Sequence, residues 1–142
     1  MPPCLDSICG KSKLGEEMRR LFLVIVDAVL LFAVLTSVPR NEDQIAIVAE
    51  ITRVLRHGGV LYISDMLLQT DSRNVARYER DEKKYGIYGV FDLVDGATVR
   101  HHERSWIDSL LWNYDPLAFD EIEAQTMNNH PASVFQWFGC RR

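Results

Sequence analysis

The chain has 142 residues, of which 47% are hydrophobic and 25% are charged, and its formal net charge is -4. This length suits one domain, and the composition is typical of a folded globular protein rather than a disordered one. Acidic and basic residues are mixed along the chain, so the sequence lacks the one-sided basic surface of a nucleic-acid-binding protein, and we expect no nucleic-acid partner.

Residues 1–20 are polar and mixed and show no convincing hydrophobic period, which predicts a poorly structured leader with at most a short helix near residues 16–21. The segment Gly10-Lys11-Ser12 is similar to the end of a phosphate-binding loop. However, Leu5 occupies the position of the first glycine of that motif, so we reject this interpretation.

The chain has three cysteines, Cys4, Cys9 and Cys140. An odd number without a dense framework argues against a disulfide-stabilised secreted domain, and Cys4 and Cys9 have no second pair to complete a zinc site. We therefore expect free thiols, no bound metal and a reducing, cytoplasmic location.

The first long apolar segment is residues 21–38. Within it, residues 23–32 predict a fully buried strand, because parallel strands that are covered on both faces are continuously apolar. The segment is long enough to cross a bilayer, which leaves a membrane helix as an alternative. That helix would place the carboxylate of Asp27 within the bilayer, and a signal peptide lacks a clean cleavage site here, so we expect no membrane insertion.

Residues 41–57 predict the clearest helix of the sequence. Asn41 can cap its first turn, with Gln44 in the reciprocal capping-box position, and Gly58 can end it. The apolar residues lie on one face at helical spacing: Ile45, Val48, Ile51 and Leu55.

Residues 60–64 predict a second buried strand directly after this helix, so the three elements form a βαβ unit with parallel strands. Ser64 and Asp65 then lie at the carboxyl end of the second strand, where ligands bind in open α/β sheets. Asp65 is either a helix cap or a site residue, and both interpretations stay open.

The second half of the chain predicts shorter elements. Residues 71–85 carry charges of both signs around a stripe of Val75, Tyr78 and Tyr85, which indicates an exposed helix that covers another part of the molecule. The pair Asp95-Gly96 predicts a two-residue hairpin turn. The remaining elements are the hairpin strands 87–94 and 97–102, a helix at 105–114, and a final strand pair at 119–127 and 134–140.

Two segments carry a family resemblance: residues 27–35, DAVLLFAVL, and residues 50–65, EITRVLRHGGVLYISD. They resemble the fourth strand, the crossover helix and the fifth strand of class I S-adenosylmethionine-dependent methyltransferases, with His57 where a proline is usual. The resemblance implies a Rossmann-like α/β fold with a parallel strand pair, followed by antiparallel C-terminal strands that residues 119–140 can supply.

The sequence also departs from this family. Its members begin with a strand that ends in a glycine-rich cofactor loop, whereas no G-x-G precedes Asp27, and three βα units do not fit before it, since one βαβ unit needs about 30 residues. The resemblance therefore assigns residues 21–142 to an incomplete domain that lacks the cofactor half. It implies S-adenosylmethionine as cofactor, with Phe32, Ala33 and Leu35 beside it, although these three residues are equally explained as core.

The candidate substrate-binding residues are spread along the chain: Asp65, Arg77, Tyr78, His101 and Asn128. The helix that contains Arg77 and Tyr78 can be a lid, or simply a solvated helix. His101 can face a substrate or lie at the exposed end of a hairpin, and it cannot easily share a metal ion with His102, because adjacent residues of a strand point to opposite faces. Turn chemistry alone explains Asn128, and we expect all three tryptophans in the core. No catalytic residue is assigned.

Two functions follow. The first is methyl transfer to an unidentified acceptor, which can be a small molecule. The chain is then either an active methyltransferase or a truncated member of that family with impaired cofactor binding. The second is a non-catalytic remnant that acts as a dimerisation or partner-binding module, because loss of the preceding strands would leave the strand at 23–32 as an open apolar edge. A nicotinamide-dependent enzyme is a weaker alternative, since its glycine fingerprint is absent too.

Overall fold

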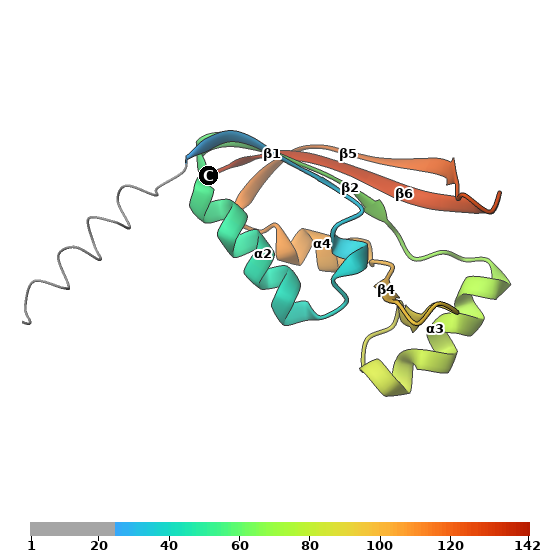
Figure 1. Ribbon diagram of the computed structural model, residues 1–142. Helices are drawn as coiled ribbons and strands as arrows, with labels where there is room; N and C mark the ends of the chain where they lie inside the picture. The colour runs from blue at the N-terminus through green and yellow to red at the C-terminus, as the bar shows by residue number, and fades with distance from the viewer. Residues whose placement is uncertain (1–24) are drawn as a thin grey trace, which may run out of the picture.

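The computed structural model describes residues 25–142, so the expected leader at 1–20, the motif at Gly10, Cys4 and Cys9 lie outside the described residues. The chain forms an α/β structure (Figure 1). Its elements are, in order, β1 (Val26–Phe32), the 3₁₀ turn η1 (Leu35–Ser37), α2 (Asn41–Val54), β2 (Leu55–Met66), α3 (Ser72–Tyr85), β3 (Val90–Asp92), β4 (Thr98–Arg100), α4 (Arg104–Leu110), β5 (Tyr114–Gln125) and β6 (Pro131–Arg141).

The main sheet has four strands in the order β1-β2-β6-β5. β1 and β2 are parallel and are connected by α2, whereas β6 is antiparallel to both β2 and β5. The expected combination of a parallel pair with an antiparallel C-terminal pair is therefore confirmed. β6, although it comes last, lies in the interior of the sheet, while β1 is an edge strand.

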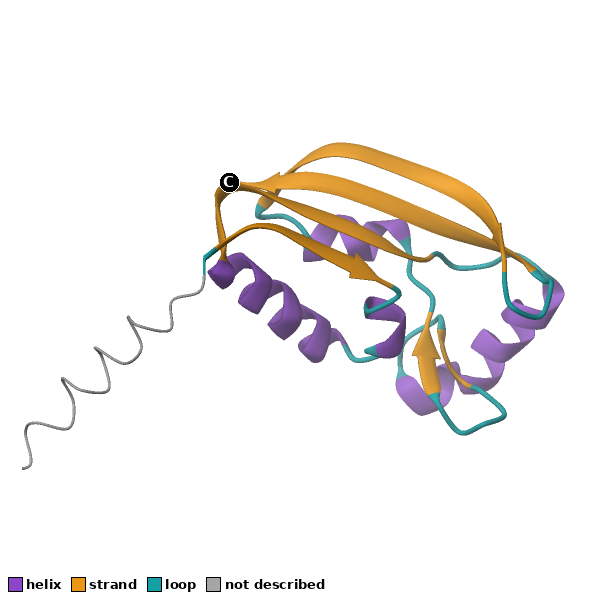
Figure 2. Ribbon diagram, turned by 45° about the horizontal axis from the view of Figure 1, so that its top comes forward, coloured by secondary structure: helices purple, strands orange, loops and turns teal. Residues whose placement is uncertain are grey.

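The hydrophobic core lies between the sheet and the helices α2 and α4, which cover the same face (Figures 1 and 2). Side chains of β2 alternate accordingly: Leu61 and Ile63 are fully buried, and Tyr62 and Ser64 on the opposite face are half-buried. Among the described residues no helix covers that second face of the sheet. The core residues come from all of these elements: Leu35, Val48, Ile51, Leu55, Leu61, Ile63, Leu67, Ile107, Leu110, Leu111, Tyr114, Phe135 and Trp137.

β1 differs from the fully buried strand that its apolar run predicts. Leu30 and Phe32 are 60% and 64% exposed. The reason is topological: β1 pairs with β2 on one side only, and its second face meets no helix within residues 25–142. The extended conformation of Val26–Phe32 also excludes one continuous helix across residues 21–38, and the described part of the chain contains no helix long and apolar enough to cross a membrane.

α2 ends earlier than its sequence pattern predicts, at Val54 rather than residue 57. The predicted capping box is wrong as well, since Arg40 occupies the N-cap without a side-chain bond and Gln44 is fully buried. Gly58, with φ of 71°, lies within an irregular stretch of β2, where the pairing jumps from Val26–Leu55 to Ala28–Val60. This bulge lets the chain turn from the helix directly into a strand longer than residues 60–64.

α3 and the β3–β4 hairpin form a small lobe beyond the carboxyl ends of β1 and β2 (Figure 1). Asp71 caps α3, accepting a hydrogen bond from the Asn74 N–H. The hairpin loop has three residues, 94–96, rather than the predicted two, because the Leu93 N–H bonds to the Ala97 carbonyl and Gly96 has φ of 88°. Its strands are also shorter than 87–94 and 97–102.

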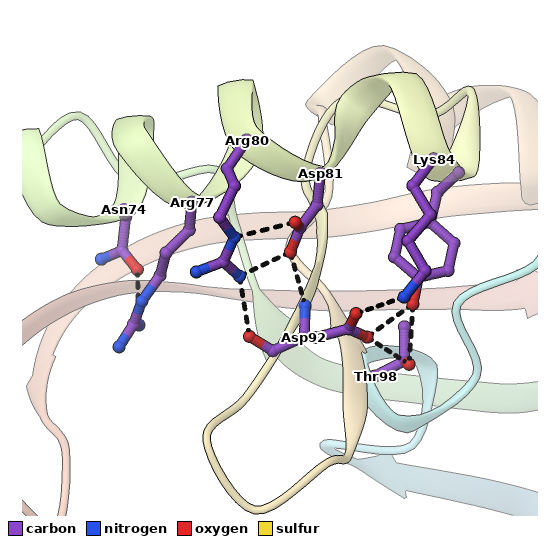
Figure 3. Close-up of polar contacts among 8 residues, drawn as sticks. Asn74, Arg77, Arg80, Asp81, Lys84, Asp92 and Thr98 are labelled. Atoms are coloured by element: carbon purple, nitrogen blue, oxygen red, sulfur yellow. Dashed lines mark hydrogen bonds and ion pairs between the residues drawn. The ribbon is translucent and has the colours of Figure 1, made fainter.

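A row of charged groups holds α3 against this hairpin (Figure 3). The Asp81 carboxylate accepts from Arg80 and from the Asp92 N–H at 2.9 Å, which lowers the pKa of Asp81 to about 2. Lys84 Nζ lies 2.5 Å from Asp92, and the Tyr85 hydroxyl donates to the same carboxylate. These contacts lower the pKa of Asp92 and raise that of Lys84. The exposed helix expected at 71–85 thus covers the hairpin.

α4 is shorter than the predicted helix at 105–114, because Tyr114 already begins β5. Ile107, Leu110 and Leu111 face the core. The expectation that all three tryptophans are core residues is wrong for Trp112, which is 68% exposed, and right for Trp137, which is 2% exposed. The two final strands are confirmed with longer bounds than 119–127 and 134–140.

Candidate functional site

The carboxyl ends of β1 and β2 meet at one edge of the sheet, as the βαβ pattern predicts. The Ala33 N–H donates to the Ser64 carbonyl at 2.9 Å, which continues the pairing for one residue beyond β1. Ala33 adopts φ of 53°, and the chain then turns into η1. The loop after β1 therefore lies directly against the end of β2.

Asp65 fixes this loop. Its carboxylate accepts the Leu35 N–H at 2.8 Å, the Thr36 N–H at 3.2 Å and the Met66 N–H at 2.8 Å, and it also contacts the Thr36 hydroxyl. Asp65 is only 2% exposed. The capping interpretation of its sequence position is therefore confirmed, because Asp65 caps the short helix η1 from the neighbouring strand, at the carboxyl edge of the sheet.

A buried polar network continues from this carboxylate. The Thr36 hydroxyl lies 2.9 Å from the Arg100 carbonyl oxygen. The Gln44 amide nitrogen lies 3.0 Å from the Leu35 carbonyl and 2.9 Å from His102 Nε2, and the Trp106 indole donates to Gln44 Oε1 at 2.7 Å. The network thus connects η1, α2 and the segment that leads into α4.

His102 is held as a neutral ring by these contacts. An amide nitrogen only donates, so Nε2 of His102 accepts from Gln44, and the ring proton resides on Nδ1, which donates to the Met66 carbonyl at 3.1 Å. Burial lowers the pKa of His102, and the nearby Asp65 partly opposes this. The side chain is 1% exposed, so the expectation of an exposed hairpin end at residues 101 and 102 is wrong.

The three residues expected beside a cofactor occupy two environments. Leu35 is completely buried in the core, whereas Phe32 is 64% exposed and its ring lies 5.6 Å from that of Tyr62. Ala33 is exposed between them. Phe32 and Ala33 are thus accessible at the edge, and Leu35 contributes through its backbone N–H to Asp65.

Tyr78 and His101 lie together in the small lobe. The Tyr78 hydroxyl accepts the Gln69 N–H at 3.1 Å and lies at hydrogen-bond distance, 2.5 Å, from His101 Nδ1. Burial raises the pKa of Tyr78 to about 12 and lowers that of His101 to about 4. Arg77 lies beside them, with its guanidinium 5.4 Å from the centre of the Phe91 ring. The structure therefore brings three of the candidate substrate residues into one cluster.

Asn128 lies apart from this cluster, in the exposed turn between β5 and β6. The turn is closed by the Asn129 N–H, which bonds to the Thr126 carbonyl, and Asn129 has φ of 57°. Within residues 25–142, no other candidate residue hydrogen-bonds to the Asn128 side chain. Nor do three metal-ligating side chains converge anywhere in that part of the chain.

Three hollows surround the network. An open depression of about 600 Å³ borders His102, and a smaller one of about 280 Å³ borders Arg100 and Trp106. A third, of about 510 Å³, lies between α2 and α4 and is lined by Ile45 and Trp112. The first two lie at the junction of the sheet edge and the small lobe, where a substrate can be enclosed.

The residues that sequence analysis missed are those inside this network: Thr36, Gln44, Arg100 and Trp106. One signal was available for Arg100. Strand alternation places Arg100 on the same face as His102, so the two side chains could have been grouped together, although nothing in the sequence showed that this face is buried. The long-range contacts of Gln44 and Trp106 leave no such local signal.

The described residues do not complete a site for S-adenosylmethionine. A Rossmann-like fold holds this kind of ligand where glycine backbone approaches it closely. The glycines within residues 25–142 are at positions 58, 59, 86, 89, 96 and 139, and none follows the end of β1. At the end of β1 this part of the chain has Phe32 and Ala33 exposed instead of glycine.

Comparison with solved structures relates this arrangement to methyltransferases. A SAM-dependent methyltransferase from Methanosarcina mazei superposes with a TM-score of 0.76 at 21% identity, over 83% of this chain and 60% of that protein. The N-methyltransferase NodS from Bradyrhizobium japonicum, solved with S-adenosyl-L-homocysteine, gives 0.52 at 10% identity, over 82% and 46%. The 1,6-didemethyltoxoflavin-N1-methyltransferase from Burkholderia thailandensis, solved with bound 1,6-didemethyltoxoflavin and S-adenosylhomocysteine, gives 0.54 at 13% identity, over 83% and 44%.

Comparison of the sequence with protein-family models and with curated proteins gave no match. The likeness is therefore one of fold. The chain has the Rossmann-like fold of the class I S-adenosylmethionine-dependent methyltransferases and spans between 44% and 60% of the length of these three proteins. The resemblance carried by residues 27–35 and 50–65 is confirmed at this level.

Proposed function

We propose that this chain is the acceptor-side part of a methyltransferase domain that transfers a methyl group from S-adenosylmethionine. One observation carries the proposal: the order β1-β2-β6-β5, with its parallel and antiparallel pairs, superposes on a methyltransferase over 83% of the chain with a TM-score of 0.76. The fold alone does not define a reaction, so the residues at the sheet edge must support it.

The chemistry of methyl transfer suits this edge. Transfer from a sulfonium is a direct displacement, so the protein mainly has to orient the acceptor and exclude water, and no catalytic triad is required. Asp65 bonds to the loop after β1 directly, and His102 bonds to Gln44, which in turn donates to the Leu35 carbonyl of that loop. The hollows beside Arg100 and His102 lie next to that loop and offer space for an acceptor.

Calorimetric titration with S-adenosylmethionine tests the proposal. A dissociation constant tighter than about 100 μM supports methyl transfer by this chain, and S-adenosylhomocysteine should compete for the same site. Phe32→Asp should weaken that binding, because Phe32 forms the exposed wall, whereas Met127→Asp, at a fully exposed site in the β5–β6 turn, should leave it unchanged. The absence of a binding signal when a folded chain is titrated with S-adenosylmethionine contradicts the proposal.

A second function is favoured by the exposed apolar face around β1. We propose, as the alternative, a non-catalytic module that self-associates through this edge and face. Leu30 and Phe32 are more than half exposed, as is Ile25, and Phe138 on β6 adds to the same surface. An edge strand with free backbone groups can pair with a second copy. In either function, cysteine usage supports the cytoplasm as the location.

A further inference from the structure

Arg100 is an unusual interior residue. Its side chain is only 4% exposed, and the guanidinium lies 4.8 Å from the centre of the Trp106 ring. Nη1 donates to the Pro39 carbonyl at 3.1 Å and to Asn41 Oδ1 at 2.7 Å. Within residues 25–142, Nε is buried and has no hydrogen-bond partner. Both partners of Nη1 are neutral groups.

A buried guanidinium without a carboxylate is unfavourable. Interior charges are normally paired, because removal from water destabilises the charged form. Among residues 25–142 no carboxylate oxygen lies within 4 Å of Arg100, and burial lowers its pKa, which the charge of the more distant Glu103 partly opposes. Within the described residues the guanidinium therefore lies against the Trp106 ring without a direct carboxylate partner, an arrangement that suits an anion.

A hollow is present beside this group. It measures about 280 Å³ and is lined by Ile87, Tyr88, Arg100, Glu103, Ser105, Trp106 and Ser109. Its walls are two aromatic rings and one aliphatic side chain, with hydroxyl groups at intervals. A cavity of this composition suits a small apolar or aromatic molecule with one anionic group.

Glu103 restricts the charge of that group. It lines the same hollow, is exposed, and accepts from the Ser105 hydroxyl at 3.2 Å. Its negative charge acts against a ligand of high negative charge, such as phosphate, more strongly than against a single carboxylate. The combination of one guanidinium with one nearby glutamate therefore favours a monocarboxylate.

We propose that the hollow beside Arg100 binds the carboxylate of a small aromatic or apolar acid. The site lies next to the sheet edge, since the Arg100 backbone carbonyl contacts Thr36 and its guanidinium contacts Asn41 at the start of α2. This acid is then the methyl acceptor, an assignment that rests on the proposed function. The carboxylate site itself does not depend on it.

Binding of benzoate to the 142-residue chain tests the site, with benzamide as the neutral isostere and inorganic phosphate as the competing anion. Calorimetry should detect benzoate and neither of the others at the same concentration. Arg100→Met should weaken benzoate binding at least about tenfold, because a charge-assisted hydrogen bond is lost. Glu103→Gln should strengthen it about two- to fivefold, since a nearby like charge is removed.

Arg40→Met is the matched control, because it removes a positive charge next to Pro39 from a residue that is exposed. It should leave benzoate affinity unchanged. Thermal unfolding without ligand checks that each variant folds. If Arg100→Met does not fold, Arg100→Lys replaces it in the test. Arg100→Lys keeps the positive charge and should retain only part of the benzoate affinity.

The proposal is overturned if benzoate does not bind to the folded wild-type chain, if benzamide binds equally well, or if Arg100→Met retains full affinity. Preferred binding of phosphate overturns the monocarboxylate assignment. If benzoate binds and S-adenosylmethionine does not, the carboxylate site is supported and only the proposed methyl transfer is contradicted. Failure of the site and failure of the proposed function are therefore distinguishable.

Discussion

Asp65 shows how one side chain can set the geometry of the sheet edge. Its two oxygens accept backbone N–H groups from Leu35, Thr36 and Met66, so a carboxylate is required in this position. Asp65→Asn would turn one acceptor into a donor that faces buried N–H groups. We expect a loss of about 2–3 kcal/mol in the free energy of unfolding, measured by urea denaturation.

The control for this substitution is Asp27→Asn. Asp27 is an exposed carboxylate on β1 that pairs with exposed Arg56 at 2.5 Å. Exposed ion pairs contribute little, so the change should stay within about 0.5 kcal/mol. Equal effects of the two substitutions would contradict the role assigned to Asp65.

The buried histidine His101 predicts a pH dependence of stability. Its pKa falls from 6.5 to about 4 on folding because it is buried, so the unfolded chain takes up a proton that the folded chain does not. Stability should therefore be highest above pH 6.5 and decline as the pH falls from 6.5 to 4. The lowered pKa values of Asp81 and Asp92 add a further loss only below about pH 4.

Urea unfolding measured at intervals between pH 7 and pH 4 checks this expectation. His101→Gln should reduce the slope in that window, while His57→Gln, at an exposed position, should not. A flat profile between pH 6.5 and 4 would show that His101 is protonated in the folded chain, contrary to its burial.

At the residue scale, the sequence predicted positions at the sheet edge better than contacts in the interior. Asp65 lies at the carboxyl end of β2, as its place after a strand predicts, and Tyr78 and His101 are neighbours. Gln44 was misassigned to a capping box because local spacing cannot reveal that Leu35, His102 and Trp106 surround it. Such contacts depend on the tertiary arrangement of three elements.

Among the elements, the junction between the small lobe and the sheet depends on Gly89. It has φ of 98°, and an added Cβ would lie 2.7 Å from Leu68 Cδ2 and still closer to the His101 carbonyl oxygen. Gly89→Ala therefore combines backbone strain with a steric clash. We expect a destabilisation of about 3 kcal/mol or more, measured by thermal and urea unfolding.

Gly96→Ala is the matched control in the same hairpin. Gly96 also has a positive φ, 88°, but nothing lies within 4 Å of an added Cβ. Only the backbone strain remains, about 1–2 kcal/mol. If both substitutions had the same effect, the close packing of Gly89 against His101 would not limit the stability of the lobe.

The types of the elements were predictable from the sequence, because hydrophobic periodicity indicates which face of an element is buried. The bounds of the elements were not predictable in this way. The helix at 41–57 loses its last turn because the chain bulges into β2 at Gly58 and Gly59, and a Cβ on Gly59 would meet Leu55 Cδ1 at 2.7 Å. The strand at 23–32 was predicted as buried because an apolar run does not distinguish a covered strand from an uncovered one. That difference lies in the neighbours, which no local pattern encodes.

For the whole molecule, the uncovered sheet face predicts self-association. Leu30 is 60% exposed on the edge strand, next to Phe32 and Tyr62. If a second copy covers this surface, light scattering should show a mass that increases with concentration, and Leu30→Lys should shift the chain toward the monomer by placing a charge in the contact.

The control is Val94→Lys, which introduces the same charge at a fully exposed apolar residue in the hairpin loop. It should leave the measured mass unchanged. A clean monomer for the wild-type chain at high concentration contradicts self-association and leaves the face free for another partner.

The position of β6 has a consequence for synthesis of the chain. Within residues 25–142, β5 pairs only with β6, and β6 connects it to β2, so residues 131–141 join the two halves of the sheet. A nascent chain that has emerged only as far as residue 130 carries the β1–β2 pair and β5, but lacks the strand that lies between β2 and β5. The sheet therefore closes in a late step, and until then the ribosome-bound intermediate exposes apolar surface that favours chaperone binding.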